Sequence, residues 1–205
     1  MVRAAVLVSG GGTNLQAILD AKAAGRIPSA EIALVVASNS KAYALTRAAN
    51  AGVEGVVLHK EKTETPEAYG ERLLAVLREH RIDMVVLAGF LTILSENVIR
   101  AYDHRMLNIH PSLIPSFCGE GFYGLHVHEA ALAKGVKVTG ATVHFVNEIP
   151  DGGDIIAQTA VEVLPGDTPE VLQRRVMEQA EWLLLPRCVE EVAASLNEIA
   201  AQTVV

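Results

Sequence analysis

The chain has 205 residues, of which 50% are hydrophobic and 20% are charged, and its formal net charge is -7. This length and composition are typical of one globular α/β domain, and we expect residues 1–205 to form a single domain. The acidic balance argues against a general nucleic-acid or membrane-surface role, because such partners favour basic faces, although it does not exclude a local basic pocket.

Apolar runs of strand length alternate with helix-length segments from the N-terminus to residue 110. Strands that are apolar on both faces predict an open, mostly parallel, Rossmann-like sheet with helices on both faces. Thr65 as a cap and Pro66 at the first helical position mark the start of the third helix. The predicted strands are 4–8, 32–38, 55–59, 84–89 and 105–110, and the predicted helices are 14–25, 42–52, 65–80 and 96–102.

The pattern changes after Pro111. Residues 137–146 and 154–163 are two further strand-like runs, which predict an antiparallel or mixed extension of the sheet. Residues 168–200 predict a long C-terminal helix that is bent or broken at Pro186.

The cysteines and the N-terminus indicate a cellular compartment. The two cysteines, Cys118 and Cys188, form neither a disulfide framework nor a metal-site spacing. We therefore expect free thiols and a cytoplasmic protein. The N-terminal apolar run is too short for the core of a signal peptide, and no window approaches the ~18 apolar residues that span a bilayer.

A glycine-rich loop, SGGGTN at residues 9–14, follows the first strand. In parallel sheets ligands bind beyond the carboxyl ends of the strands, and the helix that follows offers unpaired N–H groups to a phosphate. The loop matches neither the dinucleotide fingerprint, whose third glycine is replaced by Leu15, nor a Walker loop. A phosphate site and a tight turn without a ligand are equally good interpretations of the loop alone.

The fifth strand ends in Asn108, His110 and Pro111. Period-two geometry places Asn108 and His110 on one face of the strand, and Pro111 prevents further ladder hydrogen bonds. An amide beside an imidazole can donate two hydrogen bonds to one oxygen, which is an oxyanion-stabilising arrangement. The alternative is an asparagine that caps a turn beside a histidine bonded to a backbone carbonyl.

Residues 147–156, NEIPDGGDII, form a loop between the two late strands. Asp151 with the following glycine is a common hairpin turn signal, but its carboxylate could instead be aimed at His110 and favour the charged imidazole. Thr142 and His144 share one strand face and are candidates for the same network, with a structural role favoured for His144 alone. His126 and His128 form an H-x-H pair, which is weak support for a metal because no further ligands are apparent.

Several segments occur in the order and spacing of a known family: LVSGGGTNLQAIL, VVLAGFLTILS, MLNIHPSLIPSF, GATVHFV and DGGDIIAQ. On these segments the chain resembles, over essentially its whole length, the phosphoribosylglycinamide formyltransferases among the folate-dependent formyltransferases. The resemblance implies transfer of the formyl group of 10-formyltetrahydrofolate to the glycyl amine of glycinamide ribonucleotide in purine biosynthesis. It also implies small-molecule substrates, no metal, no nucleic-acid or membrane partner, and a monomer or homodimer.

The resemblance also implies roles for particular residues. The catalytic residues would be Asn108, His110 and Asp151, supported by Thr142 and His144. The half at about 1–100 would bind the ribonucleotide phosphate, and the half at about 101–205 would hold the folate and the catalytic groups. The ribonucleotide residues would be Gly11, Gly12, Thr13, Asn14 and Glu181. The folate residues would be Phe90, Leu91, Thr92, Ile93, Leu94, Val98, Asn108, Val146, Asn147, Glu148, Ile149, Pro150 and Asp151.

Two features depart from the family pattern. The loop CGEGFYG, residues 118–124, is longer than in some members. Many members carry an arginine near the start of the third helix, where this chain has Pro66, and Lys60 or Lys62 is the candidate to replace it.

Three alternative functions remain to be separated. A methionyl-tRNA formyltransferase would carry an additional tRNA domain, which we do not expect in an acidic chain of 205 residues. A formyltetrahydrofolate hydrolase usually carries an N-terminal regulatory domain, which we do not expect ahead of a first strand that starts at about residue 3. A silent phosphosugar- or folate-binding module would lack one of the three catalytic residues, and all three are present.

Overall fold

The computed structural model describes residues 1–203, and its centre is a seven-stranded sheet in the order β3-β2-β1-β4-β5-β6-β7. The first five strands run parallel, and β6 and β7 extend the sheet antiparallel. This confirms the predicted mostly parallel sheet with a mixed extension. The strands are β1 (Val2–Val8), β2 (Ala30–Ala37), β3 (Glu54–Val57), β4 (Met84–Leu87), β5 (Met106–His110), β6 (Val138–Phe145) and β7 (Ile155–Glu162).

Helices cover both faces of the sheet. Successive residues of the central strands point to opposite sides, so each face contributes its own set of apolar side chains. In β1, Val6 and Val8 join one apolar cluster, while Ala5 and Leu7 join the other. The first cluster packs under α1 (Thr13–Ala23), α2 (Ala44–Asn50), α5 (Leu125–Lys134), α6 (Pro169–Val176) and α7 (Trp182–Thr203). The second packs under α3 (Pro66–Glu79) and α4 (Glu96–Ala101).

The third helix begins as its sequence predicts. Thr65 accepts a hydrogen bond from the backbone N–H of Ala68, and Pro66 is the first helical residue. A proline is favourable there, because that position has no intrahelical partner for a backbone N–H.

At Pro186, where we expected the C-terminal helix to be bent or broken, the helix is not broken. The helix α7 runs through Pro186 without interruption to Thr203. The irregularity lies earlier, in a π-helical turn η1 (Met177–Glu181) between α6 and α7. Pro186 lies near the start of α7, and we attribute the tolerance of its missing N–H to the widened turn that precedes it.

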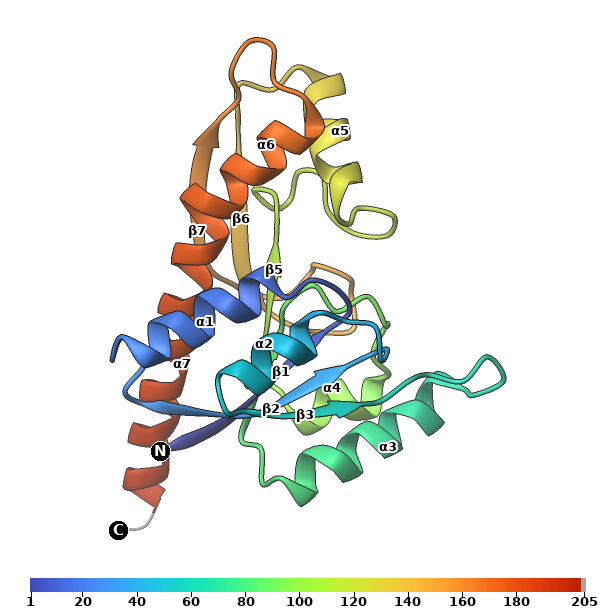
Figure 1. Ribbon diagram of the computed structural model, residues 1–205, viewed down its shortest axis with the longest axis vertical. Helices are drawn as coiled ribbons and strands as arrows, with labels where there is room; N and C mark the ends of the chain where they lie inside the picture. Colours follow the sequence, from blue (N-terminus) through green and yellow to red (C-terminus); the bar gives the residue numbers. More distant parts are fainter. Residues whose placement is uncertain (204–205) are drawn as a thin grey trace.

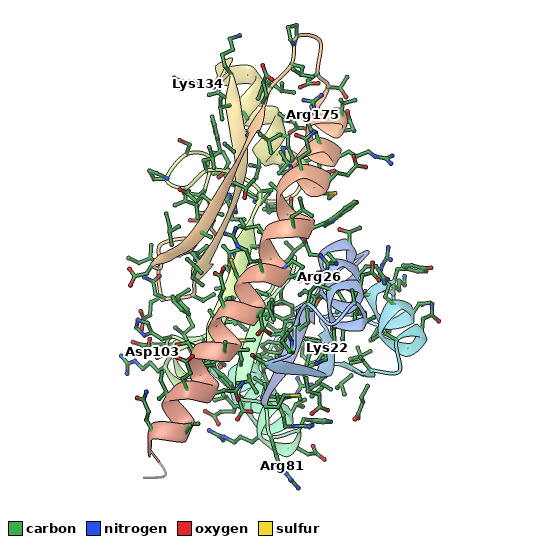
Figure 2. The ribbon with its side chains drawn as sticks, turned by 90° about the vertical axis from the view of Figure 1, so that its left-hand side faces the viewer. Lys22, Arg26, Arg81, Asp103, Lys134 and Arg175 are labelled. Atoms are coloured by element: carbon green, nitrogen blue, oxygen red, sulfur yellow. The ribbon has the colours of Figure 1, made fainter. Side chains whose placement is uncertain are left out.

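The molecule is elongated, with β6, β7, α5 and α6 at one end and α3 and α4 towards the other (Figure 1). Figure 2 shows the continuous helical run of α6, η1 and α7 along the length of the molecule, with Lys22 and Arg26 of the α1 region beside it. Within residues 1–203, none of the helices combines the length and apolarity that a membrane span requires. The carboxyl ends of β1, β4 and β5 lie at one edge of the sheet, so the loops that follow them meet there.

Candidate active site

The carboxyl end of β5 pairs with β6, and this pairing brings four polar side chains together. Asn108 lies opposite His144, and His110 lies opposite Thr142 in the antiparallel register. Opposed residues on one face of a strand pair have neighbouring side chains. The predicted shared face of Asn108 and His110 and the predicted shared face of Thr142 and His144 are therefore combined in one cluster.

His144 orients the amide of Asn108. The Nδ1 of His144 lies 2.7 Å from the carbonyl oxygen of Phe145, so this nitrogen carries the proton and donates. With the proton on Nδ1, the Nε2 accepts from Asn108 Nδ2 at 3.1 Å. The amide orientation follows from this hydrogen-bond pattern.

Asp151 reaches into the same cluster from the loop between β6 and β7. Its Oδ1 lies 3.4 Å from Asn108 Nδ2 and 3.6 Å from His144 Nε2. Its Oδ2 lies 3.4 Å from His110 Nδ1 and accepts a 2.8 Å hydrogen bond from the N–H of Gly119. Asp151 has a positive φ of 55°, so it is a turn residue whose carboxylate is aimed at the histidine. Asp151 therefore lies in a turn and also directs its carboxylate at His110, which are the two alternatives that the sequence left open.

The loop after β5 holds the outer side of His110. The Nε2 of His110 donates to the carbonyl oxygen of Phe117 at 2.8 Å, while Nδ1 faces Asp151. Burial lowers the pKa of His110, although the charge of Asp151 and the Phe117 carbonyl act in the opposite direction. Both ring nitrogens therefore face hydrogen-bond acceptors inside the protein.

The carboxylate of Asp151 remains ionised in this environment. Burial alone would raise its pKa, but the nearby imidazole of His144, the charge of His110 and the Gly119 N–H hold the pKa of Asp151 below its ordinary value. A buried carboxylate that stays charged beside a histidine is an arrangement typical of catalytic sites.

Thr142 supports the loop that leaves β5. Its hydroxyl donates to the carbonyl oxygen of Ser112 at 2.7 Å and accepts from the N–H of Ile114 at 3.1 Å. Gln158 of β7 donates to the same hydroxyl at 2.9 Å. Thr142 thus fixes the chain between Pro111 and the Phe117 carbonyl and is placed to act through the backbone.

A cavity of about 170 Å³ lies beside Asn108 and Asp151. Its rim is apolar and exposed, with Leu91 63%, Ile93 79% and Ile149 66% exposed. Val98, a predicted member of the lining, is instead fully buried in the core, and Ile99 lines the cavity in its place. The lining residues are Leu87, Phe90, Leu91, Thr92, Ile93, Leu94, Ile99, Asn108, His144, Val146, Asn147, Glu148, Ile149, Pro150 and Asp151.

A second cavity of about 210 Å³ lies between the glycine-rich loop and the end of β5. It contains all five residues proposed for the ribonucleotide, together with Gly10, Ala88, Gly89, Ile109, Pro111, Gly124, His128, Gln173 and Met177. Gly12 caps α1 with a φ of 72°, and a Cβ on it would lie 2.6 Å from Ala44 Cβ. Only glycine fits there without displacing α2.

Glu181 is buried in this second cavity. Its Oε2 accepts a 2.6 Å hydrogen bond from Asn14 Nδ2, so η1 and the start of α1 are joined. Burial raises the pKa of Glu181, and the Asn14 hydrogen bond opposes that rise. A buried acid of this kind matches donors such as sugar hydroxyl groups.

The two cavities lie on the two sides of the strand ends. Leu87 and Asn108 border the first, while the neighbouring residues Ala88 and Ile109 border the second. Ser9 links their loops, because its Oγ accepts from the N–H of Leu91 at 2.9 Å. Two different molecules could therefore bind with their reacting ends at the end of β5.

Sequence reasoning did not identify every member of the site. It missed Ile99, the backbone groups of Phe117 and Gly119, and the contribution of His128 to the second cavity. Neither Lys60 nor Lys62 lines either cavity, and the Lys60 ammonium donates to the Glu64 carbonyl at 2.8 Å. Among the described residues, no group of three or more His, Cys, Asp or Glu side chains is arranged to hold a metal.

Named proteins are similar to this chain along most of its length. The phosphoribosylglycinamide formyltransferase of Haemophilus influenzae is 39% identical over 194 residues, which are 93% of this chain and 86% of that protein. The chloroplastic enzyme of the same name from Arabidopsis thaliana is 38% identical over 195 residues, which are 95% of this chain. The chain spans 65% of the length of the Arabidopsis protein and 18% of a trifunctional purine biosynthetic protein of Bos taurus.

Solved structures give the same result. Glycinamide ribonucleotide transformylase 1 from Symbiobacterium toebii superposes with a TM-score of 0.88 at 42% identity, covering 95% of this chain and 89% of the other. Phosphoribosylglycinamide formyltransferase from Bacillus halodurans gives a TM-score of 0.85 at 37% identity, covering 93% and 94%. A family model described as formyl transferase matches residues 2–189. The chain therefore belongs to the formyl transferase family.

Proposed function

We propose that the protein is a phosphoribosylglycinamide formyltransferase, which moves the formyl group of 10-formyltetrahydrofolate to the amine of glycinamide ribonucleotide. The names of its relatives support this activity. The observation that carries the proposal is the convergence of Asn108, His110 and Asp151 where two cavities adjoin. The cavity beside Asn108 would take the folate, and the cavity at the glycine-rich loop would take the ribonucleotide.

The reaction would proceed by direct attack of the amine on the formyl carbon. A bond forms between the amine nitrogen and the formyl carbon, and negative charge develops on the formyl oxygen. Asn108 and His110 would donate hydrogen bonds to that oxygen. The catalytic hydrogen bonds of a ligand-free site often shift onto substrate as it binds, so the present partners of Asn108 and His110 would be exchanged.

Asp151 would act on charge and on the proton. Its carboxylate favours the protonated form of His110 at 3.4 Å. As the carbon–nitrogen bond to the folate breaks, the proton leaves the amine and arrives on the departing folate nitrogen. Asp151 is placed to organise the water that carries it.

Positioning would supply the remaining acceleration. The two cavities hold the reacting groups side by side at the end of β5, which converts a bimolecular step into an effectively unimolecular one. The apolar rim at Leu91, Ile93 and Ile149 fits a flat, largely apolar ring system, and exclusion of water there would strengthen the oxyanion contacts.

A single assay tests the proposal. Purified protein is mixed with glycinamide ribonucleotide and 10-formyltetrahydrofolate, and the absorbance of the deformylated folate is followed. We expect product only when both substrates are present. Product without ribonucleotide would indicate a hydrolase, and product that requires methionyl-tRNA would indicate a tRNA formyltransferase. Binding of either ligand without turnover would indicate a silent module.

A further inference from the structure

His128 is a buried polar residue that the mechanism above does not use. It lies in the first turns of α5, is 0% exposed, and borders the cavity at the glycine-rich loop. Neither of its ring nitrogens has a hydrogen-bond partner among the residues that the structure describes. Buried polar groups in folded proteins are nearly always paired, so an unpaired imidazole at a cavity points to a missing ligand.

The imidazole of His128 is neutral in the free protein. Burial lowers its pKa to about 4, and His110 adds to the effect. A neutral ring offers one N–H donor and one acceptor lone pair. It therefore has a hydrogen-bond donor available for a ligand at neutral pH.

The cavity has a donor side and an acceptor side. The acceptor side consists of Glu181 and of Asn14 Oδ1, which is buried and has no partner among the described residues. The donor side lies at two helix ends, where Gly12 caps α1 and Gly124 caps α5 without a side-chain hydrogen bond to either. Both caps border the cavity, so two positive dipole ends face it.

None of the described residues that line this cavity is a lysine or an arginine, so an anion there would depend on neutral donors and helix ends. A phosphate would be repelled from the carboxyl group of Glu181 and attracted to the side of Gly12, Gly124 and His128. Sugar hydroxyl groups, which donate, would instead satisfy Glu181 and Asn14. The arrangement of groups thus gives the ribonucleotide one orientation.

We propose that His128 is a ribonucleotide-binding residue that donates a hydrogen bond to the phosphate, which is held between the N-terminal ends of α1 and α5. This inference rests on the proposed function, because it takes the cavity to be the ribonucleotide site. It assigns α5 as a second wall of the phosphate site, in addition to the glycine-rich loop.

The variant His128→Leu tests the role, with His128→Asn as the conservative replacement. Removing an unpaired buried polar group should leave the melting temperature of the ligand-free protein unchanged or higher. The affinity for ribose 5-phosphate, measured by titration, should fall about 10- to 100-fold, as expected for a hydrogen bond to a charged group. His128→Asn should recover part of the loss. The KM for 10-formyltetrahydrofolate should stay within about twofold, because His128 does not line that cavity.

His126→Leu is the matched control. His126 lies two residues earlier on the same helix, and its Nδ1 is 2.9 Å from Glu129 on the exposed surface. This variant should keep the affinity of the wild type for ribose 5-phosphate. A His128→Leu protein that loses stability but binds the phosphosugar normally would overturn the proposal.

Two further results would separate this inference from the proposed function. An equal loss of affinity for ribose 5-phosphate and for an unphosphorylated ribose analogue would assign His128 to the sugar and refute the phosphate contact. Failure of the wild type to formylate glycinamide ribonucleotide would refute the proposed function. Normal wild-type turnover with full phosphosugar affinity in His128→Leu would refute only the role of His128.

Discussion

Replacing Asp151 by asparagine tests the centre of the proposed active site, because it preserves size and removes charge. Asp151 Oδ2 accepts from the Gly119 N–H at 2.8 Å, and Oδ1 lies 3.4 Å from the amide nitrogen of Asn108. If the new amide oxygen stays on Gly119, its NH₂ group faces the NH₂ group of Asn108. If the amide flips, its NH₂ group faces the Gly119 N–H. In either orientation two hydrogen-bond donors therefore face each other without an acceptor between them.

The expected size of the effect follows from the two proposed roles of Asp151, which are to favour the charged form of the oxyanion donor His110 and to support the transfer of the proton. Loss of one oxyanion donor costs about 10²–10³ in kcat, and loss of acid–base support costs about 10²–10⁴. The two losses overlap because they act through the same network, so we expect kcat of Asp151→Asn to fall about 10²- to 10⁴-fold. At 1.36 kcal/mol for each factor of ten, this is about 3–5 kcal/mol.

Steady-state kinetics with each substrate varied in turn would measure the effect. The KM for the ribonucleotide should change less than about threefold, because Asp151 borders only the other cavity. Asp154→Asn is the matched control, since the Asp154 side chain is exposed and only its carbonyl oxygen is used, by the Phe145 N–H at 2.9 Å. A kcat for Asp151→Asn within about threefold of wild type would refute the assigned role.

Three other changes test separate parts of the structure. Ser9→Ala removes the acceptor of the Leu91 N–H and should raise the KM for 10-formyltetrahydrofolate about fivefold with little change in ribonucleotide KM; equal changes in both would contradict this. Because its pKa is raised in the folded protein, Glu181 makes the wild type lose stability as the pH rises through that pKa. The variant Glu181→Gln should therefore have a melting temperature at or above that of the wild type at pH 8, and the difference should shrink towards pH 4. The same variant should bind the ribonucleotide more weakly. Leu107→Ala, in the core, should lower the free energy of unfolding by about 3 kcal/mol in denaturant titration, and a loss below about 1 kcal/mol would contradict its burial.

The polar face of β5 could be predicted because it depends on local geometry. Period-two alternation alone puts Asn108 and His110 together, and the parallel strands put them at the ligand-binding edge. The partners of these residues could not be predicted the same way. They depend on the register of β5 with β6, which pairs residues far apart in the chain, such as Asn108 and His144, which are 36 positions apart.

Helical periodicity explains why the sequence did not reveal His128 as a member of the second cavity and why it placed Val98 rather than Ile99 in the first. Residues two apart on a helix do not share a face, so His126 points to solvent while His128 is buried. The H-x-H motif is therefore no paired metal site on this helix. In the same way Val98 and Ile99 are neighbours that face different surroundings, because Val98 is buried in the core while Ile99 lines the cavity.

The two halves of the site differ in how their polar groups are satisfied without ligand. Asn108 and His110 already donate to protein acceptors, at His144 and Phe117, so their positions are fixed before substrate arrives. In the other cavity, Asn14 Oδ1 and both nitrogens of His128 are buried without partners among residues 1–203.

This difference assigns different energetic roles to the two halves. A ligand that fills the second cavity would satisfy groups that were unpaired, so the free energy gained from these hydrogen bonds would appear directly as affinity. In the proposed mechanism the formyl oxygen would replace an existing acceptor at Asn108 and His110, and it would compete best when it carries negative charge in the transition state. Changes at His128 should therefore act on ribonucleotide binding, whereas changes at Asp151 should act on kcat.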